Sequence, residues 1–327
     1  MTKLITIWDT SVGTLNVGDE IINEAVKREL TEIYRDGHQF VTVPTHDIIG
    51  RRGRLMIKQS EATFVAGTNI LSSKYKLFRI NGWNLKLRDA FFVKGAVLLG
   101  AGWQNYQGTP SLLNKFFYKR ILNKKILHSV RDNYTKEKLE SIGINNVVNT
   151  GCPTLWKLIP EHTQKIPQQK GKKVITTISD YSTNEKARMA DEKMLKTLKE
   201  NYEEVFVWLQ GAYDENYFDS LNPELTKNIV KIPGLLQRYD QFLEENEDAD
   251  FVGTRLHAGI RAMQKCRRAI IIGIDNRAME MKKDYGLPVL ERENIDALAE
   301  YINTPFETKI GLDFDLIQKW KAQFKHE

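Results

Sequence analysis

The sequence predicts an α/β protein with two doubly wound, Rossmann-like domains that face a cleft. Short apolar runs alternate with longer helical patterns along the 327 residues, which is typical of parallel sheets covered by helices on both faces. A polar segment that holds two prolines and has no periodicity, 159–173, interrupts this alternation once. Glycine-containing turns follow several of the apolar runs, and ligands of such sheets bind outside the carboxyl ends of the strands.

The interruption divides the chain into two parts of ordinary domain size. We expect an N-terminal α/β domain over 1–160, a linker over 161–173, a C-terminal α/β domain over 174–305 and a helical tail over 306–327.

Each element is predicted from its length and apolar period, because strands are short apolar runs and helices repeat every 3–4 residues. In the first half this gives strands at 4–8, 40–43, 62–65, 96–99, 126–130 and 146–149, and helices at 19–34, 112–124 and 134–142. In the second half it gives strands at 174–178, 204–209, 251–252 and 269–274, and helices at 185–201, 235–246 and 257–266, with two more helices closing the chain.

Composition limits the function classes. The net charge of +6, from 48 basic and 42 acidic residues, suits an anionic small molecule or an anionic membrane surface better than nucleic acid, since no strong basic tract or nucleic-acid motif is present. Cys152 and Cys266 form no CxxC motif, which argues against a disulfide framework or a zinc site. We expect a cytoplasmic protein, because the start lacks the long apolar core of a signal peptide and no apolar run spans a membrane.

Three glycine turns follow strands of the first half. In WDTSVGTLNVGDEII, residues 8–22, the loop leads into a helix whose N-terminus favours an anion, although the spacing is not that of a dinucleotide fingerprint. Asp19 is there either a helix cap or a functional carboxylate. The other two turns are either tight turns or a ligand-facing rim, and they contain Gly67, Thr68, Asn69, Gly100 and Gly102.

Two basic strand ends stand out. Arg131 follows the strand at 126–130, where it either pairs with a neighbouring carboxylate such as Asp132 or binds an anion bidentately. In DFVGTRLHAGIRAM, residues 250–263, a strand gives way to a helix at Arg255, Leu256 and His257. If Leu256 turns inward, Arg255 and His257 both face the cleft; the alternative is a hydrogen-bonded histidine at a helix start.

Several of these stretches together resemble the polysaccharide pyruvyl transferase family. The matching stretches, found in order along the chain, are NVGDEII (16–22), LLGAG (98–102), SVRDNYT (129–135), GCPTL (151–155) and GTRLHAGI (253–260). No phosphate-binding P-loop, HExxH zinc motif or GxSxG nucleophile motif occurs.

The resemblance implies a fold like the two-domain GT-B glycosyltransferases. It also implies transfer of a pyruvyl group from phosphoenolpyruvate onto a sugar as a cyclic ketal, with release of phosphate and no cofactor or metal. Carried over residue by residue, it makes Arg131 and the Arg255–Leu256–His257 triplet the donor site. His257 is then the candidate acid, and Asp19, near the acceptor on the N-terminal domain, the candidate base.

Other functions stay open at the level of sequence. One alternative is a GT-B glycosyltransferase that uses a nucleotide sugar, and another is a non-catalytic binding module on the same fold. The segments 74–88 and 118–128 mix cations with large apolar residues, so they are either solvated surface or a contact with an anionic membrane that carries a lipid-linked sugar. The acceptor sugar, its linkage and the oligomeric state do not follow from the sequence.

Overall fold

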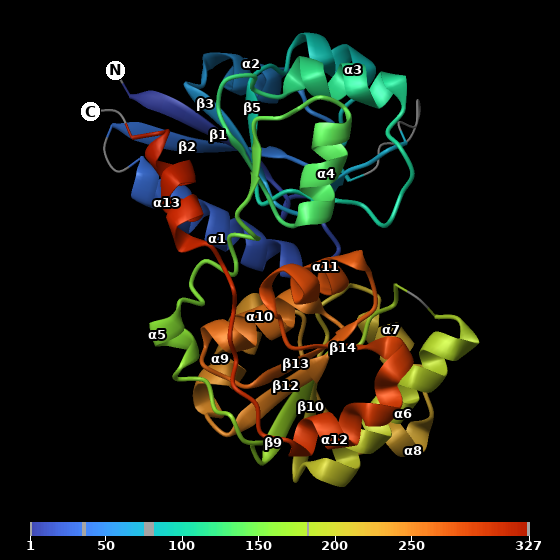
Figure 1. The fold of residues 1–327 in the computed structure, drawn as a ribbon. Coiled ribbons are helices and arrows are strands. Elements are labelled where there is room, and N and C mark those ends of the chain that lie inside the picture. Colours follow the sequence, from blue (N-terminus) through green and yellow to red (C-terminus); the bar gives the residue numbers. More distant parts are fainter. Residues whose placement is uncertain (1, 35–36, 75–81, 182, 326–327) are drawn as a thin grey trace. The chain divides into compact units, whose positions relative to one another are not determined.

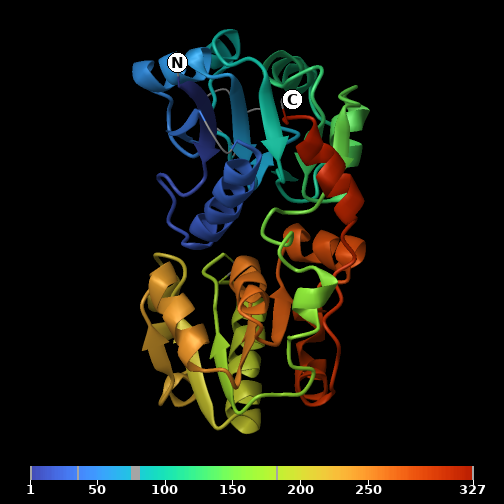
Figure 2. The same ribbon diagram turned by 90° about the vertical axis from the view of Figure 1, so that its left-hand side faces the viewer.

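The computed structural model describes residues 2–34, 37–74, 82–181 and 183–325. The chain forms two compact units. Unit 1 comprises Met1–Thr14, Ile22–Trp156 and Leu312–Glu327, and unit 2 comprises Leu15–Ile21 and Lys157–Gly311. Helices flank a parallel sheet in each unit (Figures 1 and 2), as the alternation predicts. The cleft between the domains stays a prediction.

Unit 1 is built on the parallel sheet order β2-β1-β3-β5. Its strands are β1 (Lys3–Asp9), β2 (His38–Pro44), β3 (Ala62–Ala66), β4 (Asn69–Leu71), β5 (Ala96–Leu99), β6 (Gly102–Trp103), β7 (His128–Val130) and β8 (Val147–Asn149). Its helices are α1 (Gly18–Ile33), α2 (Arg51–Gln59), the 3-10 helix η1 (Leu87–Phe91), α3 (Leu112–Ile121), α4 (Asn133–Ser141) and α13 (Phe314–Ala322). The first residues of α1, Gly18–Ile21, group with unit 2.

Unit 2 is built on the parallel order β11-β10-β9-β12-β13-β14. Its strands are β9 (Lys173–Thr176), β10 (Glu204–Trp208), β11 (Val230–Ile232), β12 (Ala249–Gly253), β13 (Ala269–Gly273) and β14 (Val289–Glu291). Its helices are α5 (Pro160–Thr163), α6 (Glu185–Asn201), α7 (Asp214–Asp219), α8 (Pro223–Thr226), α9 (Leu236–Glu245), α10 (Leu256–Gln264), α11 (Asn276–Tyr285), the 3-10 helix η2 (Arg292–Ala297) and α12 (Leu298–Asn303).

The strands and helices predicted by residue range are confirmed, with bounds that shift by a few residues. The two helices expected to close the chain are in fact three, α11, α12 and α13, with the 3-10 helix η2 among them. The missed elements are α2 and short pieces such as β11 and β14, three residues each. A three-residue run is too short to show a period, and α2 buries only Ile57 among its nine residues, so its sequence carries a weak apolar stripe.

The ends of the two domains differ from the expected boundaries. The segment 161–173, expected as a linker, belongs to unit 2, where the side chain of Ile166 is buried and His162 Nε2 lies 2.9 Å from the carbonyl oxygen of Met263. The end of the expected tail returns to unit 1, because α13 buries Trp320 against the rings of Trp156 and Phe64. Apolar contacts made far along the chain thus set both boundaries.

His128 in β7 is a buried neutral histidine. Its Nε2 lies 2.8 Å from the carbonyl oxygen of Asn123, and its Nδ1 accepts the N–H of Leu98 at 3.2 Å. The carbonyl oxygen can only accept, so Nε2 carries the proton. Burial lowers the pKa of His128 to about 4, although the hydrogen bond to Asn123 opposes this shift.

We predict that His128 makes the fold sensitive to acid. Because its pKa is lower in the folded chain than the ordinary 6.5, the unfolded chain binds more protons between about pH 6.5 and 4. Acidification through this window should cost about 3 kcal/mol of folding free energy from this one group. Urea unfolding at a series of pH values checks this.

The matched variant is His128→Gln, which is less stable at neutral pH but has no imidazole to titrate. Its stability should therefore depend less on pH between 6.5 and 4 than that of the wild type. Equal pH slopes for the two proteins would contradict the prediction.

Candidate functional site

The carboxyl edge of the unit 2 sheet contains a topological switch point. From β9 the chain moves to β10 and β11 on one side, and β12, β13 and β14 lie on the other side. Thr177 follows β9, Gln210 follows β10, and Thr254 and Arg255 follow β12. Ligands of open α/β sheets bind at such a point, so the polar side chains that converge there define the candidate site.

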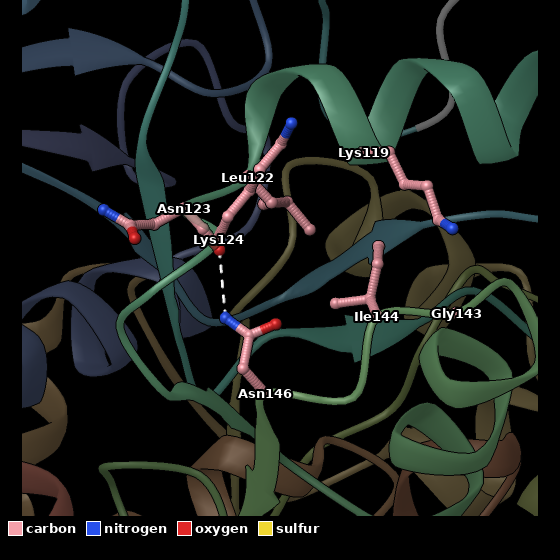
Figure 3. A pocket seen from close by; sticks show the side chains of 7 residues that line it. All are labelled: Lys119, Leu122, Asn123, Lys124, Gly143, Ile144 and Asn146. Carbon is pink, nitrogen blue, oxygen red and sulfur yellow. Dashed lines mark hydrogen bonds between the residues drawn. The ribbon is translucent and has the colours of Figure 1, made fainter.

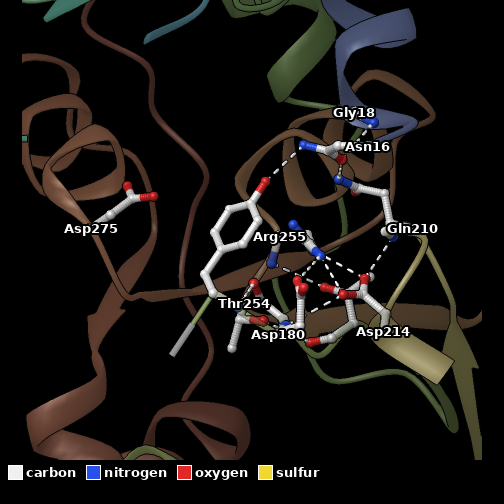
Figure 4. A network of polar contacts seen from close by, with 12 residues as sticks. Asn16, Gly18, Asp180, Gln210, Asp214, Thr254, Arg255 and Asp275 are labelled. Atoms are coloured by element: carbon white, nitrogen blue, oxygen red, sulfur yellow. Dashed lines mark hydrogen bonds and ion pairs between the residues drawn. The ribbon is translucent and has the colours of Figure 1, made fainter. Parts of the chain in front are cut away.

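Arg255 is the centre of this site (Figure 4). Its Nε donates to Asp214 Oδ2 at 3.1 Å, and its Nη2 donates both to Asp214 Oδ1 and, at 3.2 Å, to Asp180 Oδ1. Its backbone N–H donates to Thr177 Oγ1 at 3.1 Å. The residue is only 4% exposed, yet its Nη1 is buried with no hydrogen-bond partner among the described residues. A buried guanidinium N–H without an acceptor is suited to bind an anion.

Of the two carboxylates beside Arg255, that of Asp214 is buried. Burial raises the pKa of Asp214, while the Arg255 guanidinium and the backbone N–H of Gly211 oppose this rise. Gly211 is required here, since a Cβ atom at this position would lie 2.3 Å from Arg255 Nη2 and 2.9 Å from Asp214 Oδ1. The absent side chain therefore makes the space for the ion pair.

Tyr181 lies between two guanidinium groups. Its ring centroid is 4.3 Å from the Arg255 guanidinium carbon and 5.8 Å from that of Arg277, distances at which cations are attracted to a ring face. Arg277 is in turn held by Asp275, whose side chain accepts its Nε at 2.9 Å and caps α11. The edge of the sheet is therefore rich in oriented cations.

The segment Asn16–Asp19, from the first part of the sequence, contacts residues of this site. The N–H of Val17 donates to the carbonyl oxygen of Gln210 at 3.1 Å, and the Gln210 side chain donates to Asn16 Oδ1 at 2.6 Å. Asn16 also donates to the Tyr181 hydroxyl at 3.1 Å. A Cβ atom at Gly18 would lie 2.6 Å from Gln210 Nε2, so this glycine permits the contact. The NVGD and TRLH motifs, about 240 positions apart, thus share one unit.

The remaining predicted residues of this unit occupy helix starts. Leu256 and His257 form the beginning of α10, both 5% exposed, and no side chain caps this helix at Arg255. Asp19 is the second residue of α1 and is 8% exposed. The side chain that accepts the N–H of Gly18 belongs to Asn16. Burial lowers the pKa of Arg277, while Asp275 and, to a smaller extent, the charge of Asp19 raise it. Catalytic roles for His257 and Asp19 stay predictions.

In unit 1 the predicted glycines lie where backbones pack closely. A Cβ atom at Gly67 would lie 2.3 Å from the carbonyl oxygen of Gly100, and Gly100 itself has a φ of 68° against Pro153. The carbonyl oxygen of Thr68 accepts the N–H of Gly102 at 2.9 Å. Packing alone explains why these positions are glycine, and contact with a ligand stays a prediction.

Arg131 is buried at the same edge of unit 1. Its Nε donates to Asp132 Oδ2 at 2.9 Å and its Nη1 to Asn69 Oδ1 at 2.7 Å. Asp132 also caps α4 by accepting the N–H of Thr135 at 2.7 Å. A Cβ atom at Gly102 would lie within 2.4 Å of the guanidinium group, so the glycine makes room for it. The pairing with Asp132 that the sequence allowed is present, but in the interior instead of at the surface.

Four residues of the site around Arg255 were not predicted from the sequence: Asp180, Tyr181, Gln210 and Asp214. A signal for part of this set was present, because LQGAYDENY (209–217) has the same strand-then-glycine pattern as the turns that were selected. Among the described residues, no group of three His, Cys, Asp or Glu side chains is placed to hold a metal ion. Within the described residues, no helix has both the length and the apolar character needed to cross a bilayer.

The motif residues and their geometry agree with a family match. The family model of polysaccharide pyruvyl transferases matches residues 16–276, a span that contains both the NVGD segment and the start of α10. The chain belongs to this family. Membership indicates an enzyme, a transferase with a sugar acceptor. A search among curated proteins finds no match.

Solved structures show the same fold over the whole chain. The UDP-GlcNAc 2-epimerase of Methanocaldococcus jannaschii is 13% identical with a TM-score of 0.55, over 97% of this chain and 99% of that one. The S. aureus protein MnaA is 12% identical with a TM-score of 0.56, over 100% of this chain and 93% of that one. The pyruvyl transferase family member therefore has two Rossmann-like domains of the GT-B type.

We predict that the Arg255–Asp214 pair depends on Gly211. In Gly211→Ala the added methyl group occupies the position of the guanidinium, so a buried ion pair is broken. The expected cost is about 3 kcal/mol of unfolding free energy. Urea unfolding followed by intrinsic fluorescence measures it.

Gly311→Ala is the matched control in the same unit, since its Cβ atom would meet nothing closer than 3.8 Å. This variant should unfold at the wild-type urea concentration. If both alanine variants unfold together, the ion pair does not depend on the glycine.

Proposed function

We propose that this pyruvyl transferase uses phosphoenolpyruvate as its donor and forms a cyclic ketal on a sugar of a polysaccharide or its precursor, as in exopolysaccharide or cell-envelope biosynthesis. The observation that carries the proposal is the buried Nη1 of Arg255, which has no hydrogen-bond partner among the described residues. It lies beside the start of α10, where the Arg255 side chain makes no cap. A guanidinium and a helix N-terminus both attract phosphate and carboxylate groups, and phosphoenolpyruvate carries one of each.

The donor chemistry needs a proton and a nucleophile. His257, in the first turn of α10, gives a proton to the methylene carbon of the enol, and a sugar hydroxyl bonds to the neighbouring carbon as its own proton passes to Asp19. The carbon–oxygen bond to phosphate then breaks, and phosphate leaves with the bonding electrons. A second hydroxyl closes the ketal ring and releases its proton. No step requires a metal or a cofactor.

The partly buried carboxylates have a positioning role in this proposal. Asp214 and Asp180 hold Nε and Nη2 of Arg255, so Nη1 points to the donor in one orientation. Arg131 is a further proposed donor ligand, carried by unit 1. On the acceptor side, the proposal includes a lipid-linked sugar and work at the inner face of a membrane.

A glycosyltransferase that uses a nucleotide sugar is the second candidate. It is favoured by the similar structures, whose names record bound UDP and, for the Methanocaldococcus enzyme, UDP-GlcNAc. A non-catalytic binding module is the third candidate. It would bind an anion at Arg255 without releasing phosphate from phosphoenolpyruvate.

The first test is ligand-dependent thermal stability. Phosphoenolpyruvate at about a hundred times its Kd should stabilise the protein by about 2.7 kcal/mol, whereas UDP should leave it unchanged. Arg255→Lys keeps a charge beside Asp214 but loses the N–H group at Nη1. The Kd for phosphoenolpyruvate should therefore rise tenfold or more, since a hydrogen bond to a charged group contributes roughly 1.5–3 kcal/mol.

The control is Arg188→Lys, a surface exchange in α6 that should respond to phosphoenolpyruvate as the wild type does. Stabilisation by UDP alone would favour the glycosyltransferase. A full response to phosphoenolpyruvate in Arg255→Lys would remove Arg255 from the donor site.

The second test addresses the proposed acid. His257→Gln should lower phosphate release by about 10²–10⁴-fold, because it removes the proton donor, while donor binding in the thermal assay persists. His162→Gln, a histidine of α5 in the same unit, should retain wild-type turnover. Near-normal turnover in His257→Gln would show that another group supplies the proton.

A further inference from the structure

Helix α3 has an outward apolar stripe in addition to its buried face. The buried side chains are Asn114, Phe117, Tyr118 and Ile121. At 100° per residue, Leu112, Phe116 and Lys119 lie on the opposite side of the helix, with Leu113 and Lys115 beside them. Leu112 is 85% exposed and Phe116 55% exposed. A water-facing stripe of this kind is uncommon on a surface that has no partner.

Two neighbouring elements extend this stripe. The 3-10 helix η1 packs against α3 and ends at Phe91, which Phe92 follows. These two side chains are exposed by 62% and 57%. Arg54 of α2 lies 2.8 Å from Asp89 of η1 and 5.5 Å from the ring of Phe92, so α2 adjoins η1. Both views place α2 and α3 at the same end of unit 1 (Figures 1 and 2). We call this surface, made by exposed side chains of α2, η1 and α3, the α2–α3 face.

Every exposed charge on the α2–α3 face is positive. The sequences of α2 and α3 contain no acidic residue, and Asp89 of η1 is fully buried against Arg54. The exposed cations on these three elements are Arg51, Arg52, Lys58, Arg88, Lys115 and Lys119. Between Asp89 and Asp132 the sequence has no acidic residue at all. Protruding aromatic and leucine side chains ringed by cations match an anionic lipid surface, where apolar groups insert and basic groups meet the headgroups.

A pocket of about 340 Å³ opens beside the end of α3 (Figure 3). It is lined by Lys119, Leu122, Asn123, Lys124, Gly143, Ile144 and Asn146. Lys119 therefore belongs both to the outward stripe and to the pocket. Two lysines at its wall suit a phosphate group, and its size suits one lipid headgroup.

We propose that the α2–α3 face docks on an anionic phospholipid bilayer, with Leu112, Phe116, Phe91 and Phe92 at the acyl boundary and the pocket around Lys119 and Lys124 holding a headgroup phosphate. The proposal uses none of the residues of the donor site, so it stands or falls separately from the function proposed above. The segment 118–128 selected in the sequence overlaps this face, whereas 75–81 of the other basic segment lies outside the described residues.

The test is flotation of the full chain with vesicles of phosphatidylcholine, alone or mixed with phosphatidylglycerol. The protein should float with the mixed vesicles at low salt and much less with phosphatidylcholine alone. Lys115→Glu with Lys119→Glu should lower the partition coefficient by roughly thirtyfold or more, because each lost cation alone contributes about fivefold. Leu112→Ser with Phe116→Ser should also reduce flotation while keeping all charges.

The matched controls are Lys186→Glu and Met189→Ser on α6 of unit 2. The side chain of Met189 is 65% exposed. These variants should float like the wild type, and all variants should keep the wild-type response to phosphoenolpyruvate. The proposal is overturned if the wild type stays in the soluble fraction, or if the α3 variants float as it does. If the wild type forms a dimer and binds no lipid, and Leu112→Ser with Phe116→Ser dissociates that dimer, the face binds a second copy of the chain instead. Inorganic phosphate at matched ionic strength should lower flotation by competing for the pocket, and unchanged flotation would contradict a headgroup phosphate there.

Discussion

The buried pair between Arg255 and Asp214 is the constraint on which the candidate site depends. Charges taken out of water need partners, and here two carboxylates hold two of the three nitrogens of one guanidinium. The pair fits only because Gly211 has no side chain. The third nitrogen, Nη1, is thereby fixed in place and makes no hydrogen bond to any described residue. A buried N–H group suited to bind an anion is thus a by-product of the way in which the charge is buried.

Backbone contacts extend this constraint to the start of the chain. The residues after β10 provide Gly211 and Gln210, and the same turn accepts the N–H of Val17 and pairs Asn16 with Gly211. The NVGD segment is therefore positioned by the loop that makes space for Arg255. This explains physically how two family motifs from distant parts of the sequence come together in unit 2.

The glycines of unit 1 show that close packing can explain why a motif contains glycine. Gly67 and Gly100 permit two strand ends to meet, and Gly102 makes room for the guanidinium of Arg131. The Arg131 side chain donates a hydrogen bond to Asp132, and Asp132 caps α4. Motif residues of this kind stabilise the edge of the sheet whether or not they contact substrate, so their presence in a sequence supports the fold more directly than the chemistry.

The sequence alone determined the alternation of strands and helices, the two-domain fold and the strand ends that carry Arg131, Arg255 and His257, because these follow from local period and from the rule for parallel sheets. It also contained the family motifs. Only the tertiary structure decided that Leu15–Ile21 joins unit 2, that α13 returns to unit 1, and that Asp214 and Asp180 hold Arg255. The physical reason is that these partners are distant in sequence, and a carboxylate or an apolar side chain does not show locally which partner it will meet when it is buried.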